Sequence, residues 1–250
     1  MSEITVSVVS HNHGDLIPNL LDQLSKFSEK LSKVIVTYNV AESSRIHTQI
    51  FPFEVCIIDN NKPKGFGANH NAAFQLCSTN YFCVLNPDVF LYLNPFEQLL
   101  IAHEEKNISI SAPLVLDMNG FRENSARHFP TFFTLIGKLL GIYYDECHFD
   151  DNDPIVNPDW VAGMFLLIRS EVYAKLSGFD ESYFLYYEDV DFCTRAWFGG
   201  FDIALCTSVS IKHDARRDSH RNIKFLKWHI VSALRYLVKY QGRLPLKRLH

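Results

Sequence analysis

Three carboxylates fall within four positions in residues 187–191 (YEDVD). The dipole of a helix favours acidic groups in its first turn, so an ordinary helix start is one explanation for this cluster. The aromatic run at residues 183–187, however, would screen Glu188 and Asp189 from water. A screened carboxylate can take a proton from an attacking hydroxyl, which makes this segment a candidate general base.

A second carboxylate, Asp88, follows the apolar run at residues 81–85 through Asn86 and Pro87. Proline stiffens the turn and holds the carboxylate at the end of the predicted strand. A hard cation that bridges two phosphates needs such an oxygen ligand, and Mg²⁺ or Mn²⁺ suits this chemistry. The alternative is an Asx turn or a helix cap. His213, just after a predicted strand, is a weaker candidate, because a lone histidine is more often a surface or core residue.

Residues 65–71 (GFGANHN) form a glycine-bearing turn that runs into a predicted helix. Such a turn brings backbone N–H groups close to a phosphate or a sugar. The chain has neither the GK[ST] of a phosphate-binding loop nor GxGxxG after the first strand, where SHNHGD stands instead. Nucleoside triphosphatase, dinucleotide-binding and nucleotidyltransferase functions therefore lose their main support.

The elements that must position these residues alternate as in a parallel sheet with crossover helices. Strands are predicted at residues 4–10, 33–38, 54–58, 81–85 and 108–115, and helices at 15–32, 68–77 and 95–106, the last capped by Asn94. Polar residues follow four of these strands: His11, Asn12, Asn39, Asp59, Asn60, Asn61, Asn86 and Asp88. Ligands of open α/β sheets bind beyond the carboxyl ends of the strands, so we predict a site at this edge.

Residues 119–158 differ in character, with polar turns, an apolar stretch and an acidic cluster, and we expect an insertion that lies over the sheet. After it come a predicted strand at 160–168, helices at 170–176 and from about Glu188, and a strand at 203–206. With 250 residues, 47% of them apolar, the chain can form one core. We predict a single α/β domain with a mostly parallel central sheet flanked by helices.

The cysteines and the first residues bear on the compartment. None of the six cysteines has CxxC or zinc-ligand spacing, so we expect reduced core residues and a reducing compartment. The start MSEITVSVVS does not resemble a secretory signal, and no run reaches 18 apolar residues. We expect a cytoplasmic protein that is not integral to a membrane.

The net charge of −4 conceals an asymmetry. Residues 212–250 hold eleven of the 24 Lys and Arg residues but two of the 28 Asp and Glu residues, which is +9 against −13 for the rest. Residues 224–239 form an amphipathic helix pattern flanked by basic residues. This tail is expected either to pack on the core or to rest on anionic lipid at the inner face of the plasma membrane. It has no motif that reads nucleic acid, and we expect no such partner.

Several segments, taken in order, resemble glycosyltransferase family 2 and in particular its bacterial rhamnosyltransferase-like branch. They are SVVSHN, KVIVTYN, NNKPKGFGANHNAAF, LNPDV, SARHFPT, WVAGMFLLIRSEVYAKLSGFDESYFLYYEDVDFCTRAWFGGF and IKHDARRDS, and they span about residues 4–219. The resemblance implies the A-type glycosyltransferase fold over residues 1–220. Its nucleotide-binding half would cover about 1–115 and its acceptor-binding half about 116–220, and the basic helical tail would follow at 221–250.

The resemblance also implies residue roles. Asp189, with Glu188 beside it, would be the catalytic base, and Asp88 and His213 would lie at the metal. The donor-binding residues would be Ser10, Asn12, Asn39, Lys64, Gly65, Phe66, Asn71, Asn86, Asp88, Trp160 and Gly163. Two positions depart from the family pattern: Asn86 replaces the first Asp of Asp-x-Asp, and Tyr38 stands where an Asp usually precedes the Asn after the second strand.

The implied activity is an inverting transfer from a nucleotide-sugar donor, with deoxythymidine-diphosphate-rhamnose as the first choice and a uridine-diphosphate hexose as an alternative. The acceptor would be a glycan or a lipid-diphosphate-linked sugar in cell-surface polysaccharide or O-antigen synthesis. The implied cofactor is Mg²⁺ or Mn²⁺. A non-catalytic, membrane-associated nucleotide-sugar binding protein is the competing hypothesis, and it predicts no role for a base. All of these roles require Asp88, Asp189 and His213 to converge at one edge of the sheet.

Overall fold

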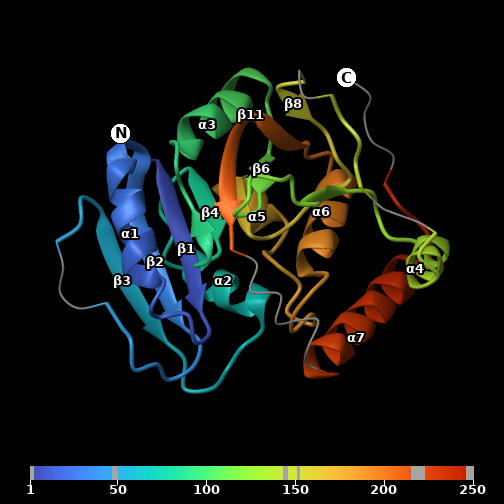
Figure 1. Cartoon of the computed structure of the whole chain (residues 1–250), viewed down its shortest axis with the longest axis horizontal. Coiled ribbons are helices and arrows are strands. Elements are labelled where there is room, and N and C mark those ends of the chain that lie inside the picture. Colours follow the sequence, from blue (N-terminus) through green and yellow to red (C-terminus); the bar gives the residue numbers. More distant parts are fainter. Residues whose placement is uncertain (1–2, 47–49, 143–145, 151–152, 215–222, 246–250) are drawn as a thin grey trace.

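The computed structural model describes residues 3–46, 50–142, 146–150, 153–214 and 223–245. Within these residues a nine-stranded sheet has the order β3-β2-β1-β4-β10-β6-β11-β5, and β8 pairs with β11 outside this path. Figure 1 shows β1, β2 and β3 on one side of the molecule and α6 and α7 on the other. The single α/β domain with a mostly parallel sheet, predicted from the sequence, is confirmed.

The first half of the chain supplies four parallel strands, β1 (Ile4–Ser10), β2 (Leu31–Tyr38), β3 (Glu54–Asp59) and β4 (Tyr81–Leu85). β1 lies between β2 and β4, and β3 pairs with β2 at the edge. β1 and β4 are buried along almost their whole length, as expected for parallel strands that are covered on both faces. Their carboxyl ends open at the same edge of the sheet.

The rest of the sheet consists of β6 (Ile110–Leu116), β10 (Phe165–Arg169) and β11 (Ile203–His213), together with the short strands β5 (Val89–Phe90) and β8 (Ile155–Val156). β10 runs antiparallel to both of its neighbours, β4 and β6. β11 runs parallel to β6 and antiparallel to β5. Because β10 is antiparallel to β4, the segment that enters β10 lies at the edge where β4 ends.

The helices are α1 (Ile17–Lys26), α2 (Phe66–Phe74), α3 (Pro95–Glu105), α4 (Phe132–Leu139), α5 (Ser170–Lys175), α6 (Glu188–Phe198) and α7 (Ile223–Tyr240). Leu24 of α1 and Phe96 of α3 belong to one buried apolar cluster of the sheet. Tyr173 of α5, Phe192 of α6 and Tyr236 of α7 belong to a second cluster. The predicted cap of α3 is confirmed, since Asn94 accepts a hydrogen bond from the N–H of Phe96 at 3.1 Å.

The largest errors in the predicted boundaries are in α1, α2 and β11. α1 ends at Lys26 and not at residue 32, because residues 28–30 form a 3₁₀ turn and Leu31 already enters the core as the first residue of β2. α2 begins at Phe66 and ends at Phe74, two and three residues earlier than predicted. β11 continues past Cys206 to His213, through an irregularity in its pairing with β6 that the apolar pattern does not reveal.

The strand predicted at residues 160–168 is two strands. β9 (Trp160–Val161) pairs with β7 (Ala126–Arg127) in a separate two-stranded ladder, whereas β10 joins the central sheet. One long strand and two short consecutive strands can have the same continuous apolar run, so the sequence pattern could not show the break. Residues 162–164 belong to neither strand and cross the edge at which the site was expected.

The insertion at 119–158 is attached to the sheet in its described part, because β8 pairs with β11. All six cysteines are free thiols, and three of them (Cys83, Cys193 and Cys206) are buried as expected. No helix in the described part of the chain has the length and apolar character needed to span a bilayer.

Candidate active site

Asp88 and His213 lie side by side where β4 and β11 end. Asp88 sits in the turn between β4 and β5, and the antiparallel pairing of Val89 with His213 places the histidine next to it. His213 Nε2 is 3.5 Å from Asp88 Oδ1, and its Nδ1 is 2.9 Å from Glu123 Oε2. The backbone N–H of Asp214 also donates to the Asp88 carbonyl at 3.0 Å. Asp88 and His213, which are far apart in the chain, therefore converge at one edge of the sheet, as predicted from the sequence.

His213 lies between the carboxylates of Asp88 and Glu123, but one oxygen of Asp88 has no hydrogen bond among the described residues. Burial lowers the pKa of His213, but the Asp88 and Glu123 carboxylates outweigh it and raise that pKa to about 9. Asp88 Oδ1 is buried and has no hydrogen-bond partner among the described residues, since the 3.5 Å contact is an ion pair without hydrogen-bond geometry. An unsatisfied buried carboxylate oxygen is costly, and a bound cation would satisfy it.

The protein supplies few ligands for such a cation. Among the described residues, no group of three or more His, Cys, Asp or Glu side chains is arranged to hold a metal ion. Asp88 offers an oxygen, and His213 offers a nitrogen once a metal displaces its proton, which fits Mg²⁺ or Mn²⁺ only if a diphosphate and water complete the coordination. Glu123, the partner of His213, was not predicted, because it stands in the irregular insertion without a spacing signal.

Asp189 lies in the first turn of α6, as predicted. Its Oδ2 accepts a hydrogen bond from the N–H of Gly163 at 3.0 Å, and its Oδ1 accepts one from the N–H of Val190 at 2.8 Å. The chain enters α6 through Tyr186 and Tyr187, which both have left-handed backbone angles with φ of 68° and 67°. This conformation is unfavourable for residues other than glycine and is common near functional sites.

The two neighbouring carboxylates are both hard to ionise. Burial raises the pKa of Glu188 well above its usual range, and the charge of Asp189 raises it further. Burial also raises the pKa of Asp189, but the N–H groups of Gly163 and Val190 and the charge of Arg127 oppose this effect. Glu188 Oε2 is buried and has no hydrogen-bond partner among the described residues. Asp189 is therefore the one of the pair that ionises first.

Residues 162–164 connect the two parts of the site. Gly163 donates to Asp189, and the carbonyl of the next residue, Met164, accepts a hydrogen bond from the N–H of Asn86 at 2.9 Å. Asn86 begins the turn that carries Asp88. A Cβ atom on Gly163 would lie in ordinary van der Waals contact with Asp189 Cβ at 3.4 Å and Phe66 Cε1 at 3.5 Å, so Gly163 packs directly beside the Asp189 side chain. Asp189 and the turn of Asp88 are therefore linked through the backbone of Gly163 and Met164, and the two carboxylates are not in direct contact.

At the other end of the edge, an amide network joins the segment after β2, the loop between β3 and α2, and the first turns of α2. Asn39 Oδ1 accepts hydrogen bonds from the N–H of Lys64 at 2.8 Å and from Asn60 Nδ2 at 2.9 Å. Asn39 Nδ2 donates to the Lys64 carbonyl at 2.9 Å. Asn69 accepts from Asn60 Nδ2 at 2.6 Å and donates to the Gly65 carbonyl at 3.0 Å. Asn39 thus fixes the turn before α2 through the backbone of Lys64, whose side chain is exposed.

Ser10 and Asn12 are held by a carboxylate that the sequence did not single out. Glu42 accepts hydrogen bonds from Ser10 Oγ at 2.8 Å and from the N–H of Asn12 at 2.9 Å. Tyr38, at the position of the usual family Asp, is buried, and its hydroxyl accepts a hydrogen bond from the N–H of Ile46 at 3.0 Å. The Tyr38 side chain therefore belongs to the core, and Glu42 is the carboxylate beside Ser10.

Three predicted donor-binding residues have mainly structural contacts. The side chain of Asn71 makes four hydrogen bonds around the turn at residues 178–181 and to Tyr173. These contacts occupy its polar atoms, so we leave Asn71 out of the candidate site. Trp160 donates from its indole to the His128 carbonyl at 3.0 Å and lines the ladder with β7. Gly65 lies against the Phe184 backbone, where a Cβ atom would be only 2.8 Å from the carbonyl oxygen.

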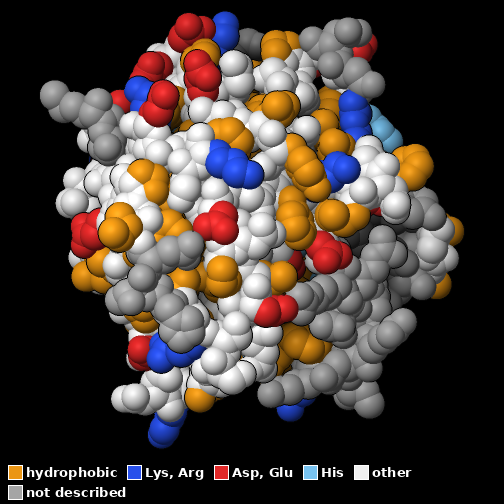
Figure 2. Space-filling view, turned by 60° about the vertical axis from the view of Figure 1, so that its left-hand side comes forward, with side chains coloured by type: hydrophobic (Ala, Val, Ile, Leu, Met, Phe, Trp, Pro, Cys, Tyr) orange, Lys and Arg blue, Asp and Glu red, His pale blue; other side chains and the backbone are white. Residues whose placement is uncertain are grey.

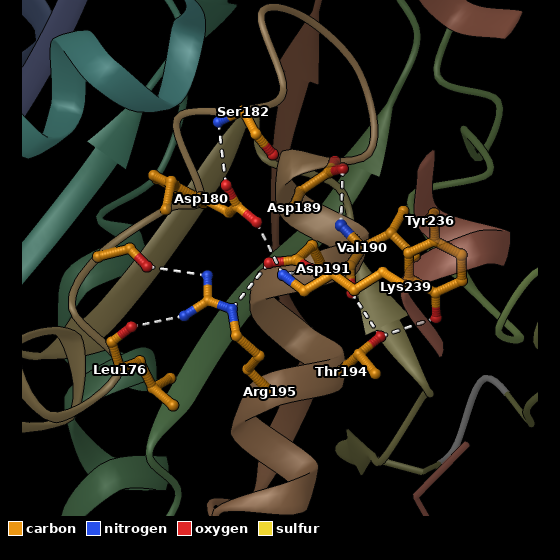
Figure 3. A network of polar contacts seen from close by, with 12 residues as sticks. Leu176, Asp180, Ser182, Asp189, Val190, Asp191, Thr194, Arg195, Tyr236 and Lys239 are labelled. Atoms are coloured by element: carbon orange, nitrogen blue, oxygen red, sulfur yellow. Dashed lines mark hydrogen bonds and ion pairs between the residues drawn. The ribbon is translucent and has the colours of Figure 1, made fainter. Parts of the chain in front are cut away.

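Side chains of helix α7 contact the first turn of α6, where Figure 3 shows Lys239 beside Asp191. Asp191 is fully buried and accepts hydrogen bonds from Arg195 Nε at 2.7 Å, Lys239 Nζ at 2.6 Å and the Tyr240 hydroxyl at 2.8 Å. Lys239 also contacts Asp180 at 2.8 Å. We name these five residues the α6–α7 clamp. It fixes the helix turn on which Asp189 stands.

Known proteins resemble this chain in sequence. The family model described as Glycosyl transferase family 2 matches residues 5–169. The chain is 28% identical over 250 residues to Rhamnosyltransferase WbbL of Escherichia coli (strain K12), which covers 94% of this chain and 93% of that protein. It is 27% identical over 241 residues to an N-acetylglucosaminyl-diphospho-decaprenol L-rhamnosyltransferase of Mycobacterium tuberculosis (strain CDC 1551 / Oshkosh), covering 88% of this chain and 78% of that protein.

Solved structures resemble it in fold. A mannosyltransferase from Pyrobaculum calidifontis in complex with GDP-Man and Mn²⁺ matches with a TM-score of 0.64 and 14% identity, over 97% of this chain and 66% of that one. GalNAc-T7 with UDP, GalNAc and Mn²⁺ matches with a TM-score of 0.66 and 13% identity, over 86% of this chain. The match spans 44% of the GalNAc-T7 chain. The fold is the A-type glycosyltransferase fold, as the sequence predicted.

Proposed function

Because the chain belongs to glycosyl transferase family 2, we propose that it is an inverting glycosyltransferase that moves a hexose from a nucleotide-sugar donor to an acceptor hydroxyl. The names of both rhamnosyltransferase relatives support rhamnose as the sugar, and that of the mycobacterial one supports L-rhamnose, with deoxythymidine-diphosphate-rhamnose as the first donor to test. A uridine-diphosphate hexose is the alternative. The name of the mycobacterial relative supports a lipid-diphosphate-linked acceptor.

In this proposal Asp189 is the general base. The acceptor oxygen attacks the anomeric carbon while Asp189 takes its proton, and the bond to the nucleoside diphosphate breaks with its electrons on the departing oxygen. One displacement inverts the anomeric carbon. The two backbone N–H groups that bind Asp189 fix the direction of its oxygens. The neighbouring Glu188 ionises at a higher pH than Asp189, and while it is neutral it adds no second negative charge to the site.

The donor diphosphate is placed at Asp88 and His213. These two side chains would hold Mg²⁺ or Mn²⁺, and a bound divalent ion neutralises the charge of the diphosphate. The nucleotide would lie over the network of Asn39 and Lys64, within the proposed nucleotide-binding half at residues 1–115. The proposed acceptor-binding half covers residues 116–220, and residues 221–250 form the tail.

The observation that carries this proposal is the hydrogen bonding of residues 163 and 164. Consecutive residues bind Asp189 on one side and the turn of Asp88 on the other. A base for the attacking hydroxyl and a ligand for the leaving group are both needed for a displacement at the anomeric carbon. A nucleotide-sugar binding protein needs the second but not the first.

The Asp189→Asn variant tests this difference. General-base catalysis contributes about 100- to 10,000-fold, so turnover should fall by this factor. Calorimetric affinity for the donor with Mn²⁺ should stay near that of the wild type, because Asn keeps the shape of the side chain. Unchanged turnover in Asp189→Asn would exclude Asp189 as the base, and a wild-type protein that binds donors without transferring or hydrolysing them would favour the binding protein. A panel of nucleotide sugars tested in the same assay identifies the donor.

A further inference from the structure

The two faces of α7 differ in chemistry. Ser232, Ala233 and Tyr236 are buried against the protein. The outer face exposes aliphatic side chains at Leu226, Ile230, Val231, Leu234 and Val238. Their spacing places them on one side of the helix, and Leu234 and Val238 are 57% and 70% exposed. The helix packs on the core with one face, and its other face has an apolar surface that the described residues leave uncovered.

The charge of this outer face has one sign. The 18 residues of α7 include no Asp or Glu. Lys227 and Arg235 are exposed next to the aliphatic residues, whereas Lys239 turns inward into the α6–α7 clamp. The face shown in Figure 2 differs, because there acidic and basic side chains are interspersed with scattered hydrophobic ones. An apolar surface with basic residues and no acidic ones complements a membrane that contains anionic lipid.

We propose that the outer face of α7 docks on an anionic phospholipid bilayer. A second copy of this chain fits less well, because a symmetric contact would place Lys227 and Arg235 of both copies close together. Nucleic acid fits less well too, since its phosphates bind polar and basic groups and would leave the aliphatic residues without a partner. The helix rests on the surface and does not cross it.

The position of α7 gives this docking a use. The Trp228 ring stacks on Phe184 with ring centroids 4.8 Å apart, and Ser232 Oγ donates to the Leu185 carbonyl at 2.9 Å. The Phe184 carbonyl accepts a hydrogen bond from the N–H of Phe66 at 2.9 Å. A docked α7 therefore borders the loop that leads to Asp189. The inference deepens the proposed function, because an acceptor carried by a lipid would arrive on the same side as the base.

Sedimentation with vesicles tests the docking of the full chain. The protein should bind vesicles of phosphatidylcholine mixed with phosphatidylglycerol more strongly than vesicles of phosphatidylcholine alone, and added salt should weaken the binding. Leu234→Glu combined with Val238→Glu should abolish it. Lys227→Gln should reduce it about fivefold, the effect of one basic residue near an anionic surface.

Matched controls lie near α3, away from α7 in Figure 1. Leu93→Glu changes an aliphatic residue that is 62% exposed, and Lys106→Gln removes an exposed charge, and both should bind vesicles like the wild type. Failure of the wild type to bind anionic vesicles would overturn the docking. So would a dimer in analytical ultracentrifugation that the double variant dissociates, or binding of duplex DNA that the same variant removes.

The outcome can be separated from that of the proposed function. The double variant should keep wild-type turnover with a water-soluble acceptor, because Leu234 and Val238 lie outside the candidate site. A wild type that binds vesicles but transfers no sugar would contradict the proposed function and leave the docking in place. A wild type that transfers sugar but ignores vesicles would do the reverse.

Discussion

The ionisation of Asp189 is set by opposing effects of its surroundings. Burial disfavours the charged carboxylate, and the N–H groups of Gly163 and Val190 favour it. The net result is a pKa above the usual value for aspartate, which suits a base that must take a proton from a hydroxyl. A carboxylate in water would ionise more easily and would be a weaker base.

This raised pKa predicts the pH dependence of transfer. As the proposed base, Asp189 would be active only when deprotonated, so kcat/KM should fall as the pH decreases through its raised pKa, with the slope of a single proton. The midpoint should lie above the ordinary aspartate value. Measurement of kcat/KM against pH, at saturating Mn²⁺ and with stability checked at each pH, gives this midpoint. An activity that persists down to the pKa of a solvent-exposed aspartate would contradict the burial argument.

The raised pKa of Glu188 predicts how the stability of the protein depends on pH. Its pKa is raised in the folded state, so the folded protein binds the proton more tightly, and stability is lost as the pH increases from the unfolded pKa to the folded one. Glu188→Gln removes this loss. The variant should therefore melt at a higher temperature than the wild type near neutral pH, and the difference should vanish in acid.

The size of this effect follows from linkage. Each pH unit between the two pKa values corresponds to about 1.4 kcal/mol, and each kcal/mol shifts the Tm of a chain of this size by about 2–4 °C. Glu105→Gln, which changes an exposed carboxylate near the end of α3, should leave the Tm close to that of the wild type. A Glu188→Gln variant that is less stable than the wild type at neutral pH would show that the carboxylate has a partner in solution.

At the scale of elements, the α6–α7 clamp joins two helices through a fully buried carboxylate. Lys239→Met removes one donor from Asp191 and from Asp180. Removing one partner of a buried ion pair costs several kcal/mol, but Lys239 is partly exposed, so we expect a loss of about 1–2 kcal/mol. Hydrogen exchange should become faster in α7, and kcat should fall more than the donor KM rises, because the turn carrying Asp189 loosens.

Lys227→Met is the matched control for the clamp. It removes a lysine from the same helix, but from its exposed face, and should leave stability within about 0.5 kcal/mol of the wild type. Equal effects of the two substitutions would mean that the clamp does not position α6.

Much of this arrangement could be predicted from the sequence, because it depends on local patterns. Apolar runs identified the parallel strands, and the polar residues after them marked the edge with the site. The break between β9 and β10 was missed, since apolar periodicity does not record which sheet a strand joins. Glu123 and the contact of Lys239 with Asp191 were also missed, because both join residues far apart in the chain without any fixed spacing.

At the scale of the whole molecule, the two proposed halves share one sheet. β10 comes from the second half of the chain and lies between β4 and β6 of the first half. A fragment that ends at residue 115 would leave the edge of β4 unpaired and its apolar faces open. We therefore expect that the two proposed halves cannot be separated as folding units.

The shared sheet predicts a single unfolding transition. The three tryptophans, Trp160, Trp197 and Trp228, all lie after residue 115, so their fluorescence reports on that part of the chain, whereas far-UV circular dichroism reports on the whole chain. Both signals should change at the same urea concentration. Separate midpoints would contradict the shared sheet, and so would a folded 1–115 fragment.

The backbone at Gly163 and Met164 has a further consequence for substrate alignment. Gly163 binds Asp189, on the acceptor side of the proposed reaction, and Met164 binds the turn of Asp88, on the donor side. These two residues are adjacent, and covalent geometry fixes the spacing between them. Thermal motion can tilt this short bridge but can hardly lengthen it. Nucleophile and leaving group would then stay in line even when the surrounding loops fluctuate, and an inserted residue at this point should damage transfer more than insertions in any of those loops.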